Sequence, residues 1–376
     1  MALNTVSSDR LSTNVKNTNF TAAEKQDLTD DIKPLLGSSG GGNKNLIING
    51  AIQMVQRGTS GSTATGYPSV DRFYTFSSGL DENPTMSQVA VTSSDSPFSE
   101  GFRQYLRFQN GNQTSGAGAS DQTWFRTSVE ARNVAQSGWN YTSSSSFITL
   151  SFWVRASVAQ TYYGFLKAPD GSNYLYPFSM ALSANTWTKV TKSIPGNSNL
   201  VFDNDTGLGL EVGIYAYLGT SLTDNSVSLN TWAAYSSGTT RTPDHTTTWY
   251  TTNDSTIDMT GVQLEVGSVA TEFEHEPFDE VARKCYRYYQ PYITYAEYVA
   301  GGTGNLGGPY VSFITPMRAS PTITSDHESK SSNWSFHSMQ FQGNANTGYY
   351  AYAMSFNTSD SNYGYMRKYG YADSEL

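Results

Sequence analysis

From residue 46 onward, hydrophobic and polar residues alternate along several short segments of the chain, and loops rich in Gly, Ser, Asn and Asp separate them. Successive side chains of a strand point to opposite faces, so this period of two predicts strands with one inward and one outward row. The segments are Arg103–Gln109, Trp124–Arg132, Ile148–Arg155, Trp187–Ile194, Leu208–Leu218 and Asp258–Val266. Many short strands divided by turns are typical of a β-sandwich, which we expect over residues 46–276.

Residues 277–290 follow a helical period instead. The apolar positions that share one helix face are Phe278, Val281, Ala282, Cys285, Tyr286 and Tyr289. Pro277 suits the first turn of a helix, and Pro291 stops it. A helix of about a dozen residues is marginal by itself in water. The pattern therefore predicts a short helical neck whose six apolar residues are covered by copies of the chain, as in a trimer, or by a neighbouring domain.

A second helical region is expected in residues 1–36. Thr21 and Glu24 have the spacing of a capping box, and Pro34 and Gly37 end the segment. Residues 37–45 then form a Gly-rich linker. A short helix on a flexible linker predicts an N-terminal helical attachment arm, and the alternative is a disordered N-terminus.

Residues 291–376 form a second, smaller β-rich region. Its clearest strands are Val311–Ile314 and Tyr349–Phe356. It ends in a segment with four tyrosines and few aliphatic residues, namely Tyr363, Tyr365, Tyr369 and Tyr371. A domain of this size can hardly bury those rings alone, so we expect a C-terminal tip in which they pack between subunits, with receptor contact as the alternative.

The composition supports a β-rich surface protein more than a helical enzyme, because 15% of residues are charged while 14% are aromatic. The net charge is −9, and residues 46–276 contain 19 acidic and 11 basic residues. Such a surface repels phosphate backbones, so nucleic acid is not expected as a partner. The single cysteine, Cys285, excludes an internal disulfide and is expected to be a buried thiol. Neither a secretion leader nor a membrane-length apolar stretch is recognised, so membrane insertion is not expected.

Catalytic signatures are missing from the sequence. The histidines at 245, 275, 327 and 337 have no metal-binding spacing, and no nucleophile or phosphate-binding motif is present. We therefore predict no catalytic residues, no metal and no cofactor. One alternative is a carboxylate pair for glycoside hydrolysis among Glu272, Glu274 and Glu276, although charge at a helix start is the simpler interpretation. A weak calcium candidate, Asp203 and Asp205, lacks the later carboxylate of a full loop, so a plain turn is preferred.

The outward rows of the predicted strands contain aromatic rings beside charged groups. The glycan-binding candidates are Tyr105, Arg107, Trp124, Arg126, Trp153, Arg155, Glu211, Tyr215 and Tyr217, with Glu130, Gln263 and Glu265 in the same rows. A sugar packs its C–H face on a ring while its hydroxyls require polar partners, and such rows can supply both. The alternative is a solvated sheet face with cross-strand Arg–Glu pairs. A second aromatic group, expected in loops that could also carry recognition, is Trp139, Tyr141, Tyr162, Tyr163, Tyr174, Trp232, Tyr235, Trp249 and Tyr250.

Several motifs resemble the fibre and receptor-binding proteins of tailed bacteriophages. They are Asn45–Thr59, Val70–Tyr74, Thr149–Ser157, Gly261–Glu274, Cys285–Gln290 and Pro316–Ile323. The resemblance covers residues 45–325 and implies a homotrimeric virion structural protein, made in the host cytoplasm and carried on the particle surface. It implies a jelly-roll β-sandwich like those that bind glycans, a helical neck and a distal β-domain. Residues 1–36 would bind other tail or capsid proteins, and the host surface polysaccharide would be the external partner. The alternatives are a purely structural virion protein, such as a capsid decoration or adaptor, and a glycan-degrading enzyme.

Overall fold

The computed structural model describes residues 44–171, 173–236, 240–299, 305–330, 334–336, 346, 348–356 and 363–376. Residues Lys44–Ala270 and Glu274–Leu376 form one compact unit. The predicted arm, residues 1–36, and most of the linker lie outside the described residues. In the described part of the chain, no helix has both the length and the apolar character needed to cross a membrane.

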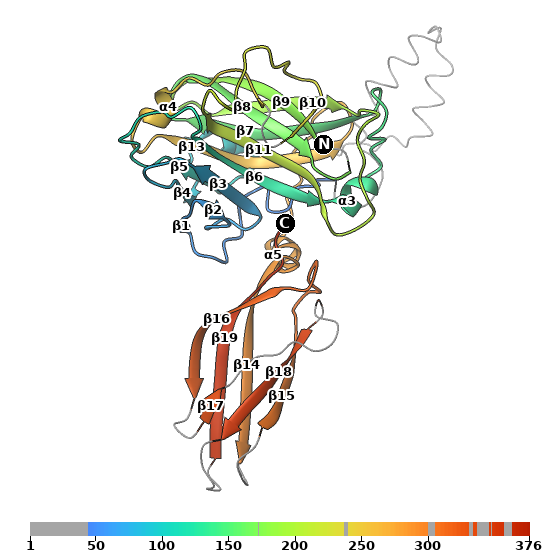
Figure 1. Cartoon of the computed structure of the whole chain (residues 1–376). Coiled ribbons are helices and arrows are strands. Elements are labelled where there is room, and N and C mark those ends of the chain that lie inside the picture. The colour runs from blue at the N-terminus through green and yellow to red at the C-terminus, as the bar shows by residue number, and fades with distance from the viewer. Residues whose placement is uncertain are drawn as a thin grey trace, which may run out of the picture. The chain divides into compact units, whose positions relative to one another are not determined.

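The first half of this unit is a sandwich of two antiparallel sheets, which Figure 1 shows packed face to face. The first sheet contains, in spatial order, β1 (Ser60–Ser62), β4 (Thr85–Ala90), β5 (Gln104–Gln109), β13 (Thr256–Val266), β7 (Phe147–Ala156) and β10 (Thr188–Pro195). The second contains β12 (Ala233–Ala234), β9 (Tyr174–Leu182), β8 (Gln160–Ala168), β11 (Leu208–Leu218), β6 (Gln122–Glu130), β3 (Phe73–Ser78) and β2 (Thr65–Gly66). The predicted β-sandwich is confirmed.

The core lies between the two sheets and is built from the predicted inward rows. On β7, for example, Ile148, Leu150, Phe152 and Val154 are all buried. Alternate residues of a strand share one face, so the same register places Trp153 and Arg155 on the outer face of the first sheet. The short helices, η1 (Ser96–Glu100), α3 (Ala131–Ala135) and α4 (Thr248–Thr251), lie in connections between strands.

Helix α5 (Phe278–Tyr286) is shorter than the predicted neck, and Tyr289 already begins strand β14. Its buried residues, Val281, Ala282 and Cys285, pack against Met54 and Ile48 of the same chain. The sandwich therefore covers these three residues, as the neighbouring-domain alternative predicts. Copies of the chain do not cover these three residues, and for them the trimer alternative is wrong. Phe278 differs from them, because 58% of its surface is exposed.

The C-terminal region forms two three-stranded antiparallel sheets. One contains β14 (Tyr289–Val299), β19 (Tyr363–Asp373) and β16 (Thr322–Lys330), and the other contains β15 (Asn305–Ser312), β18 (Gly348–Phe356) and β17 (Trp334–Phe336). A small hydrophobic cluster in this region consists of Tyr292, Phe313, Met317 and Ala372. The chain is therefore mainly β, as predicted, with a smaller β-rich region after α5. The side chains of Tyr363 and Tyr365 lie outside the described residues.

Glu130 joins the end of β6 to the segment after α5. Its carboxylate accepts hydrogen bonds from Arg287 Nε at 2.7 Å and from the Tyr288 hydroxyl at 2.6 Å. Burial favours the neutral form of Glu130, but these hydrogen bonds outweigh burial and bring its pKa below the usual value. The prediction that Glu130 lies on an open sheet face is therefore wrong, since its side chain is fully buried.

The last residues of the chain pack against the sandwich through a buried ionic cluster. Glu375 pairs with Arg72, whose side chain is fully buried, and with Arg57 at 3.3 Å. The Tyr67 hydroxyl donates to the backbone oxygen of Leu376 at 2.5 Å. Burial and the charge of Glu375 raise the pKa of Tyr67 to about 12, so this hydroxyl remains a donor at neutral pH. These contacts fix the end of β19 against the loop after Met54.

Candidate functional site

The nine predicted glycan-binding residues do not form one surface. Tyr105, Arg107, Trp153 and Arg155 lie on the outer face of the first sheet. Tyr105, however, is only 4% exposed and packs under Trp187, so it supports the face without contacting a ligand. Trp124, Arg126, Glu211 and Tyr215 lie on the outer face of the second sheet, and Tyr217 lies in the core. The two outer faces belong to different sides of the sandwich, so each is a separate candidate.

Asp258 is the centre of the first candidate. Its carboxylate, 1% exposed, accepts hydrogen bonds from Nε and Nη2 of Arg107 at 2.8 and 3.0 Å. It also accepts from Nε and Nη2 of Arg155 at 3.0 and 2.8 Å. These strands are neighbours, with β13 between β5 and β7, so the ladder itself brings the three side chains together. Charge-assisted bonds of this kind fix both guanidinium planes.

Two indole rings are fixed beside these arginines. Trp187 donates its ring N–H to Asp95 at 2.8 Å, and Trp153 donates to Glu100 at 3.0 Å. The Arg155 guanidinium lies 4.6 Å from the centre of the Trp187 ring. Burial alone would raise the pKa of Asp95, but hydrogen bonds from Thr92 and Trp187 and the charge of Arg155 bring it below the usual value. Asp95 is therefore ionised near neutral pH and holds the ring.

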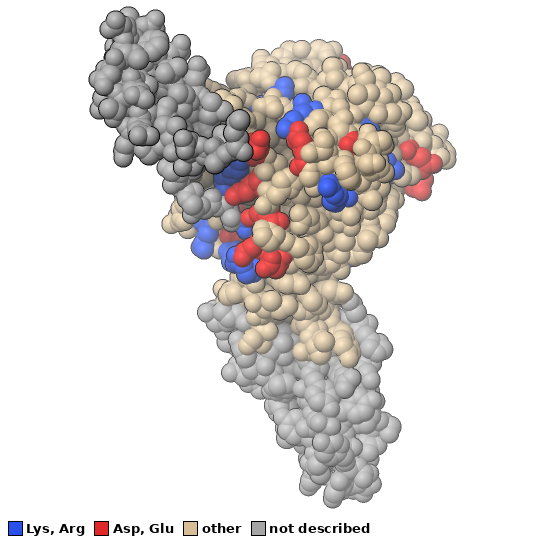
Figure 2. All heavy atoms as spheres, turned by 180° about the vertical axis from the view of Figure 1, so that it is seen from behind, with Lys and Arg blue, Asp and Glu red and all other residues tan. Residues whose placement is uncertain are grey.

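We call this surface the arginine–tryptophan face; it comprises Asp95, Glu100, Tyr105, Arg107, Trp153, Arg155, Trp187, Lys189 and Asp258. Both tryptophans are half-buried, and 31% of the Arg107 side chain is exposed. Its acidic and basic groups are paired with one another, and Figure 2 shows such interspersed charges on one side of the molecule. Ring surface and oriented N–H donors thus lie within one rigid face, which is the combination that a sugar requires.

The outer face of the second sheet is partly covered by the chain. Trp124 stacks on Phe76 with 5.0 Å between ring centroids, and Arg126 pairs with Glu211 at 3.0 Å. Tyr215, however, is 3% exposed and stacks under Phe165 at 4.3 Å. Leu222, Leu229 and Tyr235 from the segment after β11 pack against this cluster. Tyr215 therefore cannot contact a ligand in this arrangement.

The expectation that Tyr217 points outward is wrong. The pairing of β11 with β6 shifts register between Tyr215 and Tyr217, so strict alternation ends there. Tyr217 turns into the core and stacks on Tyr250 with 4.2 Å between ring centroids. A β-bulge of this kind has no signal in the pattern of this segment, which reads as continuous alternation.

Most of the aromatic residues expected in loops are also core residues. The buried ones are Trp139, Tyr162, Tyr163, Trp232, Trp249 and Tyr250, while Tyr141, Tyr174 and Tyr235 are half-buried. Tyr162 and Tyr163 are in fact in strand β8, and Trp249 and Tyr250 are in helix α4. The many Ser and Thr residues around these elements led to the incorrect prediction of loops.

The calcium candidate and the carboxylate alternative occupy structural positions. Asp205 accepts a hydrogen bond from the Gly207 backbone N–H at 2.7 Å, which is the geometry of an Asx turn. Glu274 accepts from the Asn45 backbone N–H at 2.8 Å, and Glu276 pairs with Lys284 of α5. Across the described residues, no group of three or more His, Cys, Asp or Glu side chains is arranged to hold a metal ion.

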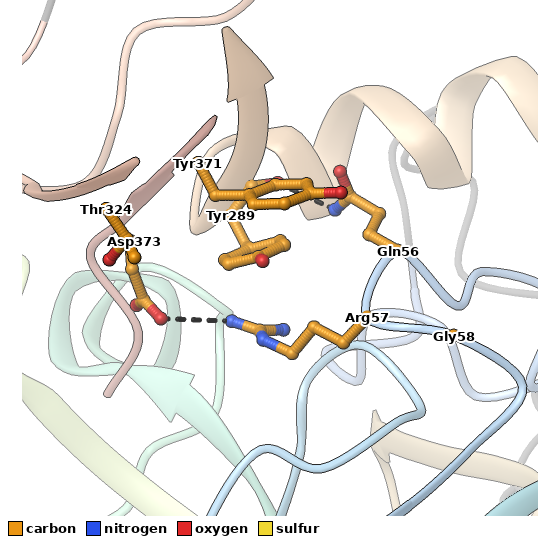
Figure 3. A pocket seen from close by; sticks show the side chains of 7 residues that line it. All are labelled: Gln56, Arg57, Gly58, Tyr289, Thr324, Tyr371 and Asp373. Carbon is orange, nitrogen blue, oxygen red and sulfur yellow. Dashed lines mark hydrogen bonds and ion pairs between the residues drawn. The ribbon is translucent and has the colours of Figure 1, made fainter. Parts of the chain in front are cut away.

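A pocket of about 530 Å³ lies where the loop after Met54 meets the sheet β14–β19–β16. Figure 3 shows its lining residues, Gln56, Arg57, Gly58, Tyr289, Thr324, Tyr371 and Asp373. We call it the junction pocket. Tyr289 was predicted on the helical neck, covered by copies or by a neighbouring domain, and Tyr371 in subunit packing or receptor contact. The other five lining residues were not predicted. No local signal could have found the pocket, because its lining comes from segments more than 200 residues apart.

Comparison with known proteins finds only distant structural similarity. No protein-family model and no curated protein matches the chain. A solved structure of the enzymatically active domain of bacteriophage CBA120 tailspike protein 4 is 8% identical, covering 60% of this chain and 22% of that one, with a TM-score of 0.32. A family 16 carbohydrate-binding module is 13% identical, covering 58% and 99%, with a TM-score of 0.28. The N-terminal cellulose-binding domain of Cellulomonas fimi β-1,4-glucanase C is 12% identical, covering 57% and 97%, with a TM-score of 0.27. The chain thus spans about a fifth of the tailspike domain.

Proposed function

We propose that this chain is a non-catalytic structural component of a phage particle that binds host surface polysaccharide through the arginine–tryptophan face. The motifs of residues 45–325 that resemble phage fibre proteins support its assignment to a phage particle. The observation that carries the binding role is the fixed geometry of the face, where Asp258 holds two guanidinium groups and two carboxylates hold two indole rings.

Such a face is suited to weak recognition of sugars. Its side chains are already ordered by contacts within the chain, so binding costs little additional side-chain entropy. The flat rings supply area for sugar C–H groups, and the guanidinium N–H groups supply donors for hydroxyls. Weak sites become effective when several copies on one particle engage one polymer, because each bound copy raises the effective concentration of the next.

The proposal includes assembly into a homotrimer carried on the particle surface, with residues 1–36 binding tail or capsid proteins. Exposed apolar residues support contact between copies: Phe278 on α5, Ile293 on β14 and Ile314 after β15. Large apolar side chains that are exposed in one copy can be covered by another copy on assembly. Sedimentation of the full chain should give the mass of a trimer. A stable single subunit at micromolar concentration would remove this part of the proposal.

The binding role is tested by titrating the full chain onto an array of bacterial surface polysaccharides. The Trp153→Ala variant should lose about tenfold or more in apparent affinity, because burying a large apolar side chain contributes about 1.5–3 kcal/mol and about 1.4 kcal/mol is a factor of ten. Trp124→Ala is the matched control, since Trp124 is an equally half-buried tryptophan on the other sheet. Equal losses in both variants, or no binding by the wild-type chain, would contradict the proposal. Release of reducing ends that Glu274→Gln abolishes would support the glycan-degrading alternative.

A second candidate is a purely structural virion protein. The same face favours it in one respect, since its ring N–H groups and carboxylates are already paired inside the chain. This candidate predicts tight binding to a capsid or tail protein and no response on the polysaccharide array. Co-purification of the chain with particle proteins separates the two.

A further inference from the structure

The junction pocket combines a hollow with a wall of stacked planar groups. It is a hollow of about 530 Å³, within the range of about 300–1,000 Å³ that holds small ligands. The loop Gln56–Gly58 forms one wall, and the outward rows of β14, β16 and β19 form the other, as Figure 3 shows. The opposite row of the sheet, which includes Tyr292 and Ala372, faces the C-terminal core.

Three planar groups form a stack at this wall. The rings of Tyr289 and Tyr371 have centroids 4.9 Å apart and planes only 12° from parallel. The Arg57 guanidinium lies 3.5 Å from the centre of the Tyr289 ring. Figure 3 shows Tyr289 between the other two groups. Tyr371 is therefore the outer member, and one face of this half-buried residue turns away from the stack.

Polar groups surround the stack in fixed positions. Asp373 accepts from Arg57 at 3.2 Å, yet 39% of its side chain is exposed, so carboxylate surface stays open to the pocket. Thr324 is the ladder partner of Tyr371 and is exposed. The Gln56 amide donates to the Tyr289 carbonyl at 2.6 Å, which ties the loop to β14. The pocket thus offers acceptors and a hydroxyl beside a ring.

The charges favour an uncharged ligand. The charged residues that line the pocket are one cation, Arg57, and one carboxylate, Asp373, and Arg57 also pairs with Glu375 behind the wall. Because Arg57 is already paired with carboxylates, an incoming anion would find no vacant cation and would meet the charge of Asp373. A uronic or sialic acid is therefore disfavoured.

We propose that the junction pocket binds one or two rings of a neutral saccharide, a second site that is separate from the arginine–tryptophan face. The outer face of Tyr371 packs against sugar C–H groups, Asp373 accepts hydrogen bonds from hydroxyls, and Thr324 exchanges hydrogen bonds with them. This inference rests on the proposed carbohydrate-binding function. It adds a second binding site and predicts that the ligand of that site is uncharged.

The test is saturation-transfer difference NMR on the full chain with methyl glycosides of glucose, galactose and mannose, with N-acetylglucosamine, and with glucuronate as the acidic probe. At least one neutral probe should respond, and glucuronate should not. In Tyr371→Ala the response should fall at least fivefold, while Tyr371→Phe, which keeps the ring, should retain most of it. Thermal unfolding of each variant checks that β19 still forms, and Thr324→Val removes one hydroxyl with little change of shape.

The outcomes separate this inference from the proposed function. Loss of the signal in Tyr371→Ala and Thr324→Val but not in Trp153→Ala supports the pocket. A signal that Trp153→Ala abolishes and Tyr371→Ala leaves intact overturns the pocket and leaves the proposed function standing. A preference for glucuronate, or silence of every neutral probe, also overturns the pocket. Polysaccharide binding by the arginine–tryptophan face is decided independently on the array.

Discussion

The arginine–tryptophan face and the junction pocket use similar residues in different ways. The face belongs to one sheet and its loops, and its charges are balanced against one another around Asp258. The pocket is formed by segments that are far apart in the sequence and are brought together by the fold. The ion pairs of Glu375 with Arg57 and Arg72 hold the end of β19 in place. The face should therefore tolerate damage at the chain's end, whereas the pocket should not.

The largest expected effect follows from Glu375→Ala. This change leaves the guanidinium of Arg72 buried without its carboxylate, and breaking a buried ion pair costs about 3–5 kcal/mol. Chemical denaturation should show that loss of stability, or a separate early transition of the C-terminal region. Saccharide binding in the pocket should vanish while polysaccharide binding to the face persists. Simultaneous loss of both would show that the two regions are not independent.

A smaller loss is expected from Asp258→Asn, which damages the face only. Two partly exposed arginines, 31% for the Arg107 side chain and 19% for that of Arg155, lose their shared carboxylate, and removing a charged hydrogen-bond partner costs about 1.5–3 kcal/mol. Polysaccharide binding should fall because the guanidinium planes are no longer fixed. The NMR response of the pocket is the internal control and should match that of the wild-type chain. An unchanged array profile in this variant would contradict the role of the face.

The remaining effects depend on a change of pH, and the two regions should respond in opposite directions. In the sandwich, burial lowers the pKa of His245 from 6.5 to about 3. A lowered folded-state pKa means that stability is present above pH 6.5 and is lost as pH falls toward 3, by at most about 1.4 kcal/mol per pH unit. The variant His245→Gln should lose less stability than the wild-type chain between pH 6.5 and 4.

At the junction, burial raises the pKa of Asp71 from 3.8 to about 6, although hydrogen bonds from Gln56 and the charge of Arg57 oppose the shift. A raised folded-state pKa means that the contribution is fully present below pH 3.8 and is lost as pH rises through 6. Asp71→Asn should therefore flatten the stability profile between pH 4 and 7. A profile identical to that of the wild-type chain would show that Asp71 does not titrate in this range.

Periodicity predicted the elements that local packing dictates. The inward row of β7 and three buried residues of α5, Val281, Ala282 and Cys285, were correctly identified, because burial of one face leaves a regular pattern in the sequence. It could not predict what covers a face. Val281 and Cys285 face Met54 of the same chain, and Tyr215 lies under the segment after β11, since these contacts join residues distant in sequence.

The candidate site was also predictable only in part: strand positions followed from alternation, but their partners from other segments did not. Trp153 and Arg155 fall on the outer face of a strand as alternation requires. Their partners Asp95 and Glu100 come from an irregular connection, and Trp187 is fixed by that same connection. Local pattern therefore located Trp153 and Arg155, but it missed Trp187 and the carboxylates that orient both rings.

The central claim is that polysaccharide binds to the arginine–tryptophan face and is not cleaved there. A crystal structure of the chain soaked with an oligosaccharide from a host surface polymer tests it most directly. The account predicts an intact saccharide lying along Trp153 and Trp187, with hydroxyls bonded to Arg107. Sugar ordered only over Trp124 on the second sheet, or a cleaved product, would contradict it.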